Sequence, residues 1–231
     1  MTRFSVIGTP IGNLEDITLR GLDRLQTADI VVCEDTRVTS RLLKKYDINV
    51  PMLSYHSKST ISKTDLIFSK IREGKNIALV SDAGTPGISD PGAELVSRIR
   101  SEFVNELASG ELKIESIPGP SALVAALSIA GVPISDFTFL GFLPHKKGRQ
   151  TLFSEIALST RTMVFYESPH RLMKTLQSLV DVLDNSKKKV TVCRELTKMY
   201  EEIMCGSAEE VLAYFSRNTD KVRGEFVVIV S

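Results

Sequence analysis

The residues best suited to chemistry in this sequence lie in a long loop rich in glycine and proline, SDAGTPGISDPG, from Ser81 to Gly92. This loop carries carboxylates at Asp82 and Asp90. Glycine keeps a backbone open, so that N–H and C=O groups can face a ligand. A second Gly-Thr-Pro turn begins at Gly8, in the segment GTPIGN. The two loops together predict a site that holds a small molecule largely through backbone groups.

The spacing of the glycines excludes two common nucleotide sites. Gly8 and Gly12 are four residues apart, and the glycines of the second loop do not fit G-x-G-x-x-G either. The sequence also contains no G-x-x-x-x-G-K-[ST], so a P-loop is excluded. The ligand is therefore neither a dinucleotide nor a nucleoside triphosphate held in those standard ways.

Each loop follows a short apolar segment that predicts a strand, and so does a third turn, Pro118-Gly119-Pro120. Ligands of open α/β sheets bind at the carboxyl ends of the strands, where all three turns are expected. A single loop of this kind is more often only a tight turn. Three of them at one sheet edge favour a functional site.

The first half of the chain alternates continuous apolar strands with helices, which predicts a mostly parallel sheet covered on both faces. The expected strands are residues 4–7, 30–33, 77–81 and 113–117, and the expected helices are 19–26, 36–46, 65–72, 93–100 and 121–130.

The segment Gly131–Asp136 (GVPISD) changes character and predicts a linker. We therefore expect two α/β domains, residues 1–135 and 136–231. The second is predicted to contain strands at 139–142, 163–166, 190–193 and 225–230 and helices at 149–158, 170–183 and 207–215, the last begun by a Ser207/Glu210 capping box.

Composition narrows the class of protein. The 231 residues carry a formal net charge of +1, so no global field recruits nucleic acid and any such contact must use local basic patches. No apolar run is long enough to span a bilayer. The cysteines (Cys33, Cys193 and Cys205) are three in number and far apart, and the histidines are scattered, so no disulfide framework or metal site is expected. These features predict a soluble protein of a reducing cytoplasm.

Basic side chains gather at two places, a helix and a loop. In the expected helix, spacings of three and four put Arg37, Arg41 and Lys44 on one face, with Val38 and Leu42 offset toward the core. A solvated helix face explains this pattern equally simply. If a polyanion binds, the expected contacts are Arg37, Arg41 and Lys44 in the helix and Lys146, Lys147 and Arg149 in the loop HKKGRQ.

Six segments, in this order along the chain, carry a resemblance to a known family: GTPIGNLEDIT, EDTR, SDAGTPGISDPG, IPGPSA, FYESPHR and RELTK. Together they closely resemble the ribosomal RNA (cytidine 2′-O)-methyltransferases of the tetrapyrrole methylase superfamily. The resemblance covers essentially the whole chain.

This resemblance implies an S-adenosyl-L-methionine-dependent enzyme that methylates the ribose of a cytidine in 16S rRNA of the small ribosomal subunit. It also implies two α/β domains, with a mostly parallel sheet in the first, a mixed sheet in the second and the cofactor in the cleft between them. The enzyme would be a cytoplasmic homodimer that needs no metal and no membrane. Many members of this branch continue past the final strand, whereas this sequence ends at Ser231.

Carried over motif by motif, the resemblance also implies the residues that contact the cofactor. In the first domain these are Pro10, Ile11, Asp82, Ala83, Gly84, Thr85, Pro86 and Ser121, followed by Ala122. In the second they are Tyr166, Arg194, Glu195, Leu196, Glu225 and Phe226.

A ribose hydroxyl is a poor nucleophile until its proton is removed or shared, so a base within reach is expected. Five residues are candidates by position, and of these the expected catalytic residues are His56, Asp82 and Lys198, with Glu34 and Asp35 as the other two. His56 is best suited by type because it accepts a proton near neutral pH, although a loop histidine without a role is an equally good explanation.

Two other functions stay open. The first is methylation of a tetrapyrrole-like small molecule, which is disfavoured because Asn13 stands where those relatives generally have an aspartate. The second is a cofactor-binding module that associates with RNA without catalysis.

Overall fold

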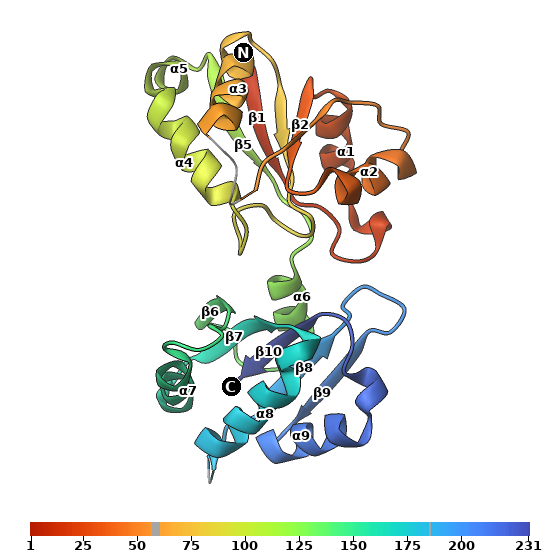
Figure 1. The fold of residues 1–231 in the computed structure, drawn as a ribbon, viewed down its shortest axis with the longest axis vertical. Helices are drawn as coiled ribbons and strands as arrows, with labels where there is room; N and C mark the ends of the chain where they lie inside the picture. Colours follow the sequence, from red (N-terminus) through yellow and green to blue (C-terminus); the bar gives the residue numbers. More distant parts are fainter. Residues whose placement is uncertain (57–60, 185) are drawn as a thin grey trace. The chain divides into compact units, whose positions relative to one another are not determined.

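A computed structural model describes residues 1–56, 61–184 and 186–231 of the chain. These form two compact units, Met1–Ser121 and Ala122–Ser231 (Figure 1). The boundary therefore comes earlier than the expected linker near residue 135. The reason is α6 (Ala122–Ile129), which follows the Pro-Gly-Pro turn and packs against strand β10 (Phe226–Val230) of the second unit.

The N-terminal unit contains a five-stranded sheet in the order β3-β2-β4-β1-β5. All four strand pairs are parallel, which confirms the expected parallel sheet. The strands are β1 (Thr2–Ile7), β2 (Ile30–Cys33), β3 (Met52–Ser54), β4 (Ile77–Leu79) and β5 (Leu112–Ile117). Strand β3 was not predicted because three residues carry too little pattern.

Helices cover both faces of this sheet, as its continuous apolar strands require (Figure 1). One apolar cluster includes Leu25 and Leu42, and the other includes Phe68 and Ile99. The helices are α1 (Leu19–Gln26), α2 (Thr36–Lys45), α3 (Ile61–Arg72), α4 (Gly92–Glu102) and α5 (Val104–Ser109). On α2 the side chains of Thr39, Leu42 and Leu43 are buried, whereas Val38 is exposed, so its expected place toward the core was wrong.

The C-terminal unit contains a second five-stranded sheet, in the order β6-β7-β10-β8-β9. Strands β6 (Phe137–Phe142) and β7 (Thr162–Glu167) pair in parallel. The pairs that join β7, β10, β8 (Val190–Arg194) and β9 (Glu202–Gly206) are antiparallel. The mixed sheet is therefore confirmed.

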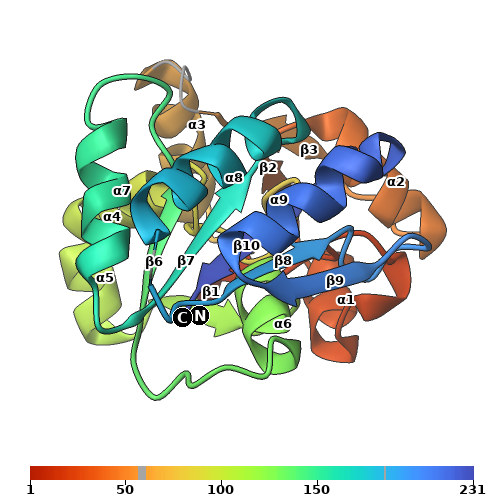
Figure 2. The same ribbon diagram turned by 90° about the horizontal axis from the view of Figure 1, so that it is seen from below.

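Three helices complete the core of the C-terminal unit: α7 (Arg149–Leu158), α8 (Pro169–Leu183) and α9 (Ala208–Arg217). Figure 2 shows α8 and α9 lying side by side across the strands. The Ser207/Glu210 capping box at the start of α9 is confirmed. Cys33 and Cys193 are buried free thiols. Within the described residues no helix is long and apolar enough to cross a membrane.

Candidate functional site

The three glycine-containing turns of the N-terminal unit meet at the carboxyl ends of their strands. Thr9 and Gly84 form a two-way backbone bridge, with N–H to O=C distances of 2.9 and 3.0 Å. The Thr9 hydroxyl also donates to the carbonyl of Ser81 at 3.1 Å. The Thr85 hydroxyl donates to the carbonyl of Pro120 at 3.3 Å, which joins the third turn to the second. The expected convergence of the turns is confirmed.

Gly8 and Gly119 let two of these turns touch backbone to backbone. A Cβ added to Gly119 would lie 2.6 Å from the carbonyl oxygen of Gly8, and one added to Gly8 would lie 2.8 Å from the Gly119 Cα. Both distances are far below van der Waals contact, so neither position accepts a side chain without movement of the main chain. The absence of side chains here is what brings the β1 and β5 loops together.

Asp90 holds the long loop in shape. Its Oδ1 accepts hydrogen bonds from the N–H groups of Gly87 and Gly92, at 2.8 and 2.7 Å. Gly84 and Gly87 have φ values of +78° and +91°, which side-chain-bearing residues rarely adopt. The loop is therefore folded by its own residues, with Ile11 packed beneath Gly84.

Carboxylates gather where β2 and β4 end. The N–H of Asp35 donates to Asp82 Oδ1 at 2.9 Å, and Asp35 in turn caps α2 by accepting from the N–H of Arg37. The Arg37 guanidinium bonds the Asp35 carboxylate and lowers its pKa to about 2. Asp35 is thus a fixed negative charge beside Asp82.

Burial and like charge raise the pKa values of the neighbouring carboxyls of Asp82 and Glu34. Partial burial raises the pKa of Asp82, and the charges of Asp35 and Asp90 add to this, although the Asp35 N–H opposes it. The pKa of Glu34 is raised by burial and by the charges of Asp82, Asp90 and Asp35. Carboxyls of raised pKa hold a proton more readily, which suits them to receive one in a reaction.

A small pocket adjoins this group of carboxyls. It is lined by Glu34, Tyr55, Leu79, Val80, Ser81, Asp90, Pro91 and Gly92. The N–H of Tyr55 donates to the carbonyl of Cys33 at 2.8 Å, which extends the β2–β3 pairing to the residue before His56. His56 therefore follows β3 at the same sheet edge at which Glu34 follows the neighbouring strand β2.

The C-terminal unit brings together most of its expected site residues at one end of its sheet. The register of β10 pairs Phe226 with Glu167 on β7 and with Arg194 on β8, and pairs Val227 with Tyr166. Tyr166, Arg194 and Phe226 therefore lie at the ends of three neighbouring strands. This juxtaposition comes from the antiparallel pairing and could not be derived from their positions in the chain.

Lys198 is bracketed by two carboxylates. Its ammonium donates to Glu195 Oε1 at 2.7 Å and to Glu225 Oε2 at 2.8 Å. Partial burial opposes the charge of Lys198, but these hydrogen bonds outweigh it and hold the pKa above its usual value. A lysine that keeps its proton so firmly is no general base at neutral pH, so the structure argues against that expected role.

Glu195 also fixes the backbone around it. Its Oε1 accepts from the N–H of Glu225, and its own N–H donates to the carbonyl of Glu225, both at 2.9 Å. Its φ of +49° is unusual for glutamate. Gly224 has a φ of +87°, which favours glycine, and a Cβ there would also overlap the Glu195 carboxyl group.

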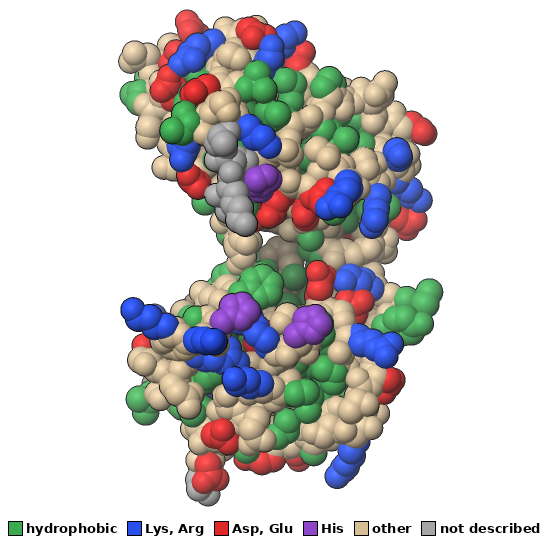
Figure 3. All heavy atoms as spheres, viewed as in Figure 1, with side chains coloured by type: hydrophobic (Ala, Val, Ile, Leu, Met, Phe, Trp, Pro, Cys, Tyr) green, Lys and Arg blue, Asp and Glu red, His purple; other side chains and the backbone are tan. Residues whose placement is uncertain are grey.

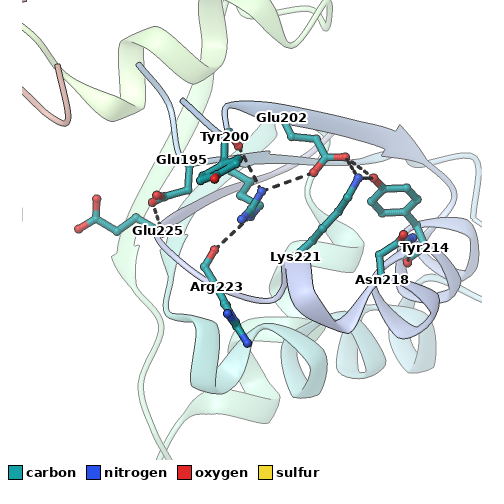
Figure 4. A network of polar contacts seen from close by, with 9 residues as sticks. Glu195, Tyr200, Glu202, Tyr214, Asn218, Lys221, Arg223 and Glu225 are labelled. Carbon is teal, nitrogen blue, oxygen red and sulfur yellow. Dashed lines mark hydrogen bonds and ion pairs between the residues drawn. The ribbon is translucent and has the colours of Figure 1, made fainter. Parts of the chain in front are cut away.

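Arg194 joins the loop that follows β8 to the loop that precedes β10, and its partners Tyr200, Glu202 and Arg223 are labelled in Figure 4. Its guanidinium donates to the carbonyls of Arg223 and Tyr200, at 3.1 and 3.2 Å, and lies 3.7 Å from Glu202. Glu202 also bonds Lys221 at 2.6 Å and the hydroxyl of Tyr214. The guanidinium is thus committed to protein groups. The sequence did not reveal Glu202, Tyr214 or Lys221, because their partners come from separate elements.

The expected RNA contacts divide into exposed and buried residues. Arg37, Arg41 and Lys44 are exposed on α2, and Lys146 and Lys147 are exposed in the loop before α7. Arg149 is buried, and assigning it to RNA was wrong. It donates to Thr175 at 2.7 Å and to the Pro144 carbonyl at 3.2 Å, and it lies over the ring of Phe153.

The remaining expected residues have local roles in the structure. Asn13 caps the short 3-10 turn Leu14–Asp16 by accepting from the N–H of Glu15 at 3.1 Å. Leu196 is buried, and Pro10, Ile11, Gly84 and Pro86 are buried in the joined loops. Ala83 is exposed, whereas Thr85, Ser121 and Ala122 are partly buried. In the described part of the chain, no three His, Cys, Asp or Glu side chains are grouped to hold a metal ion.

Comparison with known proteins identifies the class. The family model of the Tetrapyrrole (Corrin/Porphyrin) Methylases matches residues 3–212, and the chain belongs to this family. The solved structure of the methyltransferase CobJ shares the fold, with a TM-score of 0.70 and 17% identity over 100% of this chain and 94% of that one.

More similar relatives point to one branch of the family. The Ribosomal RNA small subunit methyltransferase I of Synechocystis sp. is 44% identical over 229 residues, which is 98% of this chain and 77% of that protein. The protein of the same name from Thermotoga maritima is 39% identical over 231 residues, covering 100% of this chain and 99% of the relative.

Proposed function

We propose that this protein is an S-adenosyl-L-methionine-dependent methyltransferase that acts on a cytidine 2′-hydroxyl in 16S rRNA of the small ribosomal subunit. The names and near full-length similarity of its relatives support the small-subunit substrate. The observation that carries the proposal is the joining of the β1, β4 and β5 loops through Thr9, Gly84 and Pro120 beside carboxyls of raised pKa. This arrangement offers backbone groups to a ligand and a proton acceptor to its reaction.

The cofactor supplies an activated methyl group on a sulfonium, which carries a positive charge. The residues around Pro10 and Asp82–Pro86 would hold it in the N-terminal unit, and Tyr166, Glu195 and Glu225 would contact it in the other. The negative field of Asp35, Asp82 and Glu34 favours a cation at this edge. Holding donor and acceptor in line contributes up to about 7–11 kcal/mol in model systems.

The chain's own part in the chemistry is to remove the hydroxyl proton. The bound cofactor would supply the methyl group to the ribose oxygen, and the proton of that hydroxyl must then leave. Asp82 is our candidate to receive it, because its raised pKa narrows the gap to the hydroxyl. Glu34 and His56 lie at the same edge and are the alternatives.

The substrate would be held by the basic side chains that the structure leaves exposed. On α2 these are Arg37, Arg41 and Lys44, and in the second unit they are Lys146 and Lys147. We further propose that the protein acts in the cytoplasm as a homodimer.

Incubation with labelled S-adenosyl-L-methionine and small ribosomal subunits that lack the modification tests the proposal. Label in a ribose of the 16S rRNA is the expected result. Cofactor and subunit binding without transfer would instead support a non-catalytic module. Transfer to a porphyrin-type acceptor, but not to rRNA, would support the small-molecule function.

A further inference from the structure

An aromatic side chain is presented to solvent at the end of β6, and the proposed function does not use it. Phe142, the last residue of this strand, is 56% exposed. Its pairing with Tyr166 on β7 comes after an irregularity in the register between Phe139 and Phe142. Gly141 lies at this irregularity with a φ of +62°, which favours glycine. A bulge of this kind redirects a side chain.

The exposed ring is held in place by its neighbours. It meets the ring of Tyr166 edge-on, with centroids 5.4 Å apart, and Tyr166 meets Phe139 in the same way at 5.0 Å. Edge-on contact leaves a face of the Phe142 ring available. The ring is therefore a preorganised flat surface.

Two arginine side chains anchor the backbone of the segment that follows Phe142. Leu143 is buried, and its carbonyl accepts from Arg171 at 2.7 Å. The carbonyl of Pro144 accepts from Arg149 at 3.2 Å. The carboxylate of Glu167, which has no exposed side-chain surface, bonds Arg171 at 2.8 Å and lies 3.9 Å from Arg149. One buried ion network thus fixes the start of the loop.

Past this anchor the loop is basic. Residues 145–150 read HKKGRQ, without a carboxylate, and Lys146 and Lys147 are exposed. The face of the C-terminal unit drawn in Figure 3 gathers histidine and basic side chains. An exposed aromatic surface alone would suit a protein partner as well as a nucleic acid. Two ammonium groups a few residues away favour a polyanion.

Resting on the proposed function, we propose that Phe142 stacks on an unpaired base of the rRNA substrate while Lys146 and Lys147 contact its phosphates. Base stacking on aromatic side chains is the usual way in which proteins hold single-stranded RNA, because every base offers a π-face. A paired base inside a helix has no free face. Phe142 would therefore select an accessible, unstacked segment of the substrate.

The sequence makes the test direct, because the protein contains no tryptophan. Phe142→Trp places a single indole at the proposed stacking position, and its fluorescence should be quenched by a 16S rRNA transcript in a saturable, salt-sensitive manner. The matched control is Phe137→Trp at the other end of β6, where the native side chain is 40% exposed. Its fluorescence should not respond to the RNA.

Turnover on small subunits provides the second readout. Phe142→Leu should lower kcat/KM for the subunits about 5- to 100-fold, as expected for loss of one stacked base. Phe142→Tyr should retain most of the activity, and the affinity for S-adenosyl-L-methionine should be unchanged in both variants. Phe137→Leu should behave as the wild type.

Three results would overturn the inference while leaving the proposed function intact. The first is Phe142→Leu methylating subunits as well as an active wild type, with no quenching in Phe142→Trp. The second is a loss of cofactor affinity in Phe142→Leu, which would place the ring in the cofactor pocket. The third is an indole response to protein concentration rather than to RNA, which would mark an interface between copies. A wild type without methyl transfer to rRNA contradicts the proposed function itself, whatever the indole reports.

Discussion

The backbone N–H of Asp35 donates a hydrogen bond to the Asp82 carboxylate at 2.9 Å, and this contact joins the loops that follow β2 and β4. Asp35 is itself held by Arg37 and keeps its negative charge down to a pH of about 2. Asp82 thus gains a hydrogen bond and, at the same time, a fixed like charge. Together with partial burial, that charge raises its pKa. The same arrangement that orders the two loops prepares a carboxylate to accept a proton.

The first prediction concerns turnover. Asp82→Asn keeps an oxygen that can accept the Asp35 N–H but cannot take up the proton of a ribose hydroxyl. If Asp82 is the base, single-turnover methyl transfer at saturating cofactor should fall about 10²- to 10⁴-fold. The matched control is Glu73→Gln, which removes a surface carboxylate paired with Lys70 and should change nothing. Normal turnover in Asp82→Asn would shift the role to Glu34 or His56, to be tested by Glu34→Gln and His56→Ala.

The second prediction concerns stability and pH in the same variant. Because folding raises the pKa of Asp82, the folded state binds its proton more tightly than the unfolded chain does. The resulting stabilisation is fully present below the ordinary aspartate pKa and is lost as the pH rises through the raised value. At pH 7.5 the ionised group is therefore destabilising, and Asp82→Asn should raise Tm by less than about 1 °C, because solvent screens this largely exposed carboxylate. The gain should vanish near pH 4. A lower Tm at pH 7.5 would contradict this account.

The third prediction tests the contact between Gly8 and Gly119. Gly119→Ala places a Cβ 2.6 Å from the Gly8 carbonyl oxygen, so the β1 and β5 loops must separate. We expect a loss of about 2–3 kcal/mol in the free energy of unfolding and a marked loss of cofactor binding. In Gly110→Ala the added Cβ meets nothing within 4 Å, and only the φ of +79° opposes it, at about 1 kcal/mol. Urea unfolding and calorimetric titration with S-adenosyl-L-methionine measure both effects. Equal behaviour of the two variants would show that the close approach is unimportant.

Much of the N-terminal site could be predicted from sequence because its determinants are local. Glycines, prolines and the strand before each turn are read directly along the chain, and the parallel sheet then brings the carboxyl ends together. The contact of Gly8 with Gly119 needed the structure, since a glycine shows only that a side chain is absent. Strand β9 was missed because its apolar run is only three residues long and its five positions alternate between partly buried and exposed, as expected for an edge strand.

The second unit was harder to predict because its interactions join distant segments. Arg149 lies in a basic stretch that reads as a solvated loop, but the buried carboxylate of Glu167 draws it inside. Lys198 was a candidate base because the sequence alone does not place the carboxylates of Glu195 and Glu225 beside its ammonium group. In both cases a partner remote in sequence decides the state of the charged group.

The fourth prediction separates a positioning role of Lys198 from a catalytic one. Lys198→Met leaves the carboxylates of Glu195 and Glu225 facing each other without their shared cation. The loop they hold should loosen, so the Kd for S-adenosyl-L-methionine should rise about 10-fold or more, while kcat at saturating cofactor changes less. Lys198→Arg should recover most of the affinity. A base would show the reverse, with kcat lost, Kd kept and no recovery by arginine.

The pH dependence of cofactor binding gives a further check on the contacts of Lys198 with Glu195 and Glu225. Burial opposes the charge of Glu195, but the hydrogen bond from Lys198 outweighs it and lowers the pKa of that carboxyl. The stabilisation that the ionised Glu195 provides is present above the ordinary glutamate pKa and is lost as the pH falls through the lowered pKa of Glu195. In Lys198→Met that pKa moves upward, so cofactor affinity should begin to fall at a higher pH than in the wild type. Identical pH profiles would contradict the coupling.

The fifth prediction decides what Arg149 does. Arg149→Met removes a cation beside the buried Glu167 carboxylate and leaves the Thr175 hydroxyl and the Pro144 carbonyl without that partner. Glu167 keeps its closer partner Arg171 at 2.8 Å, so the cost is that of the lost Arg149 hydrogen bonds and packing, about 1–3 kcal/mol, and Tm should fall by about 2 °C or more. Lys147→Ala, from the exposed part of the same basic stretch, should leave Tm within about 1 °C and instead weaken RNA binding with a smaller salt dependence.

The double variant supplies the decisive measurement. In Arg149→Met with Glu167→Gln the buried charge is gone, so part of the stability lost in the single variant should return, which denaturant unfolding of the four-member cycle measures. If Arg149 acted only by contacting RNA phosphates, the stability effects of the two substitutions would be independent, because the buried Glu167 does not contact RNA. Strict additivity of the two substitutions would therefore overturn the structural role, and coupling between them would establish it.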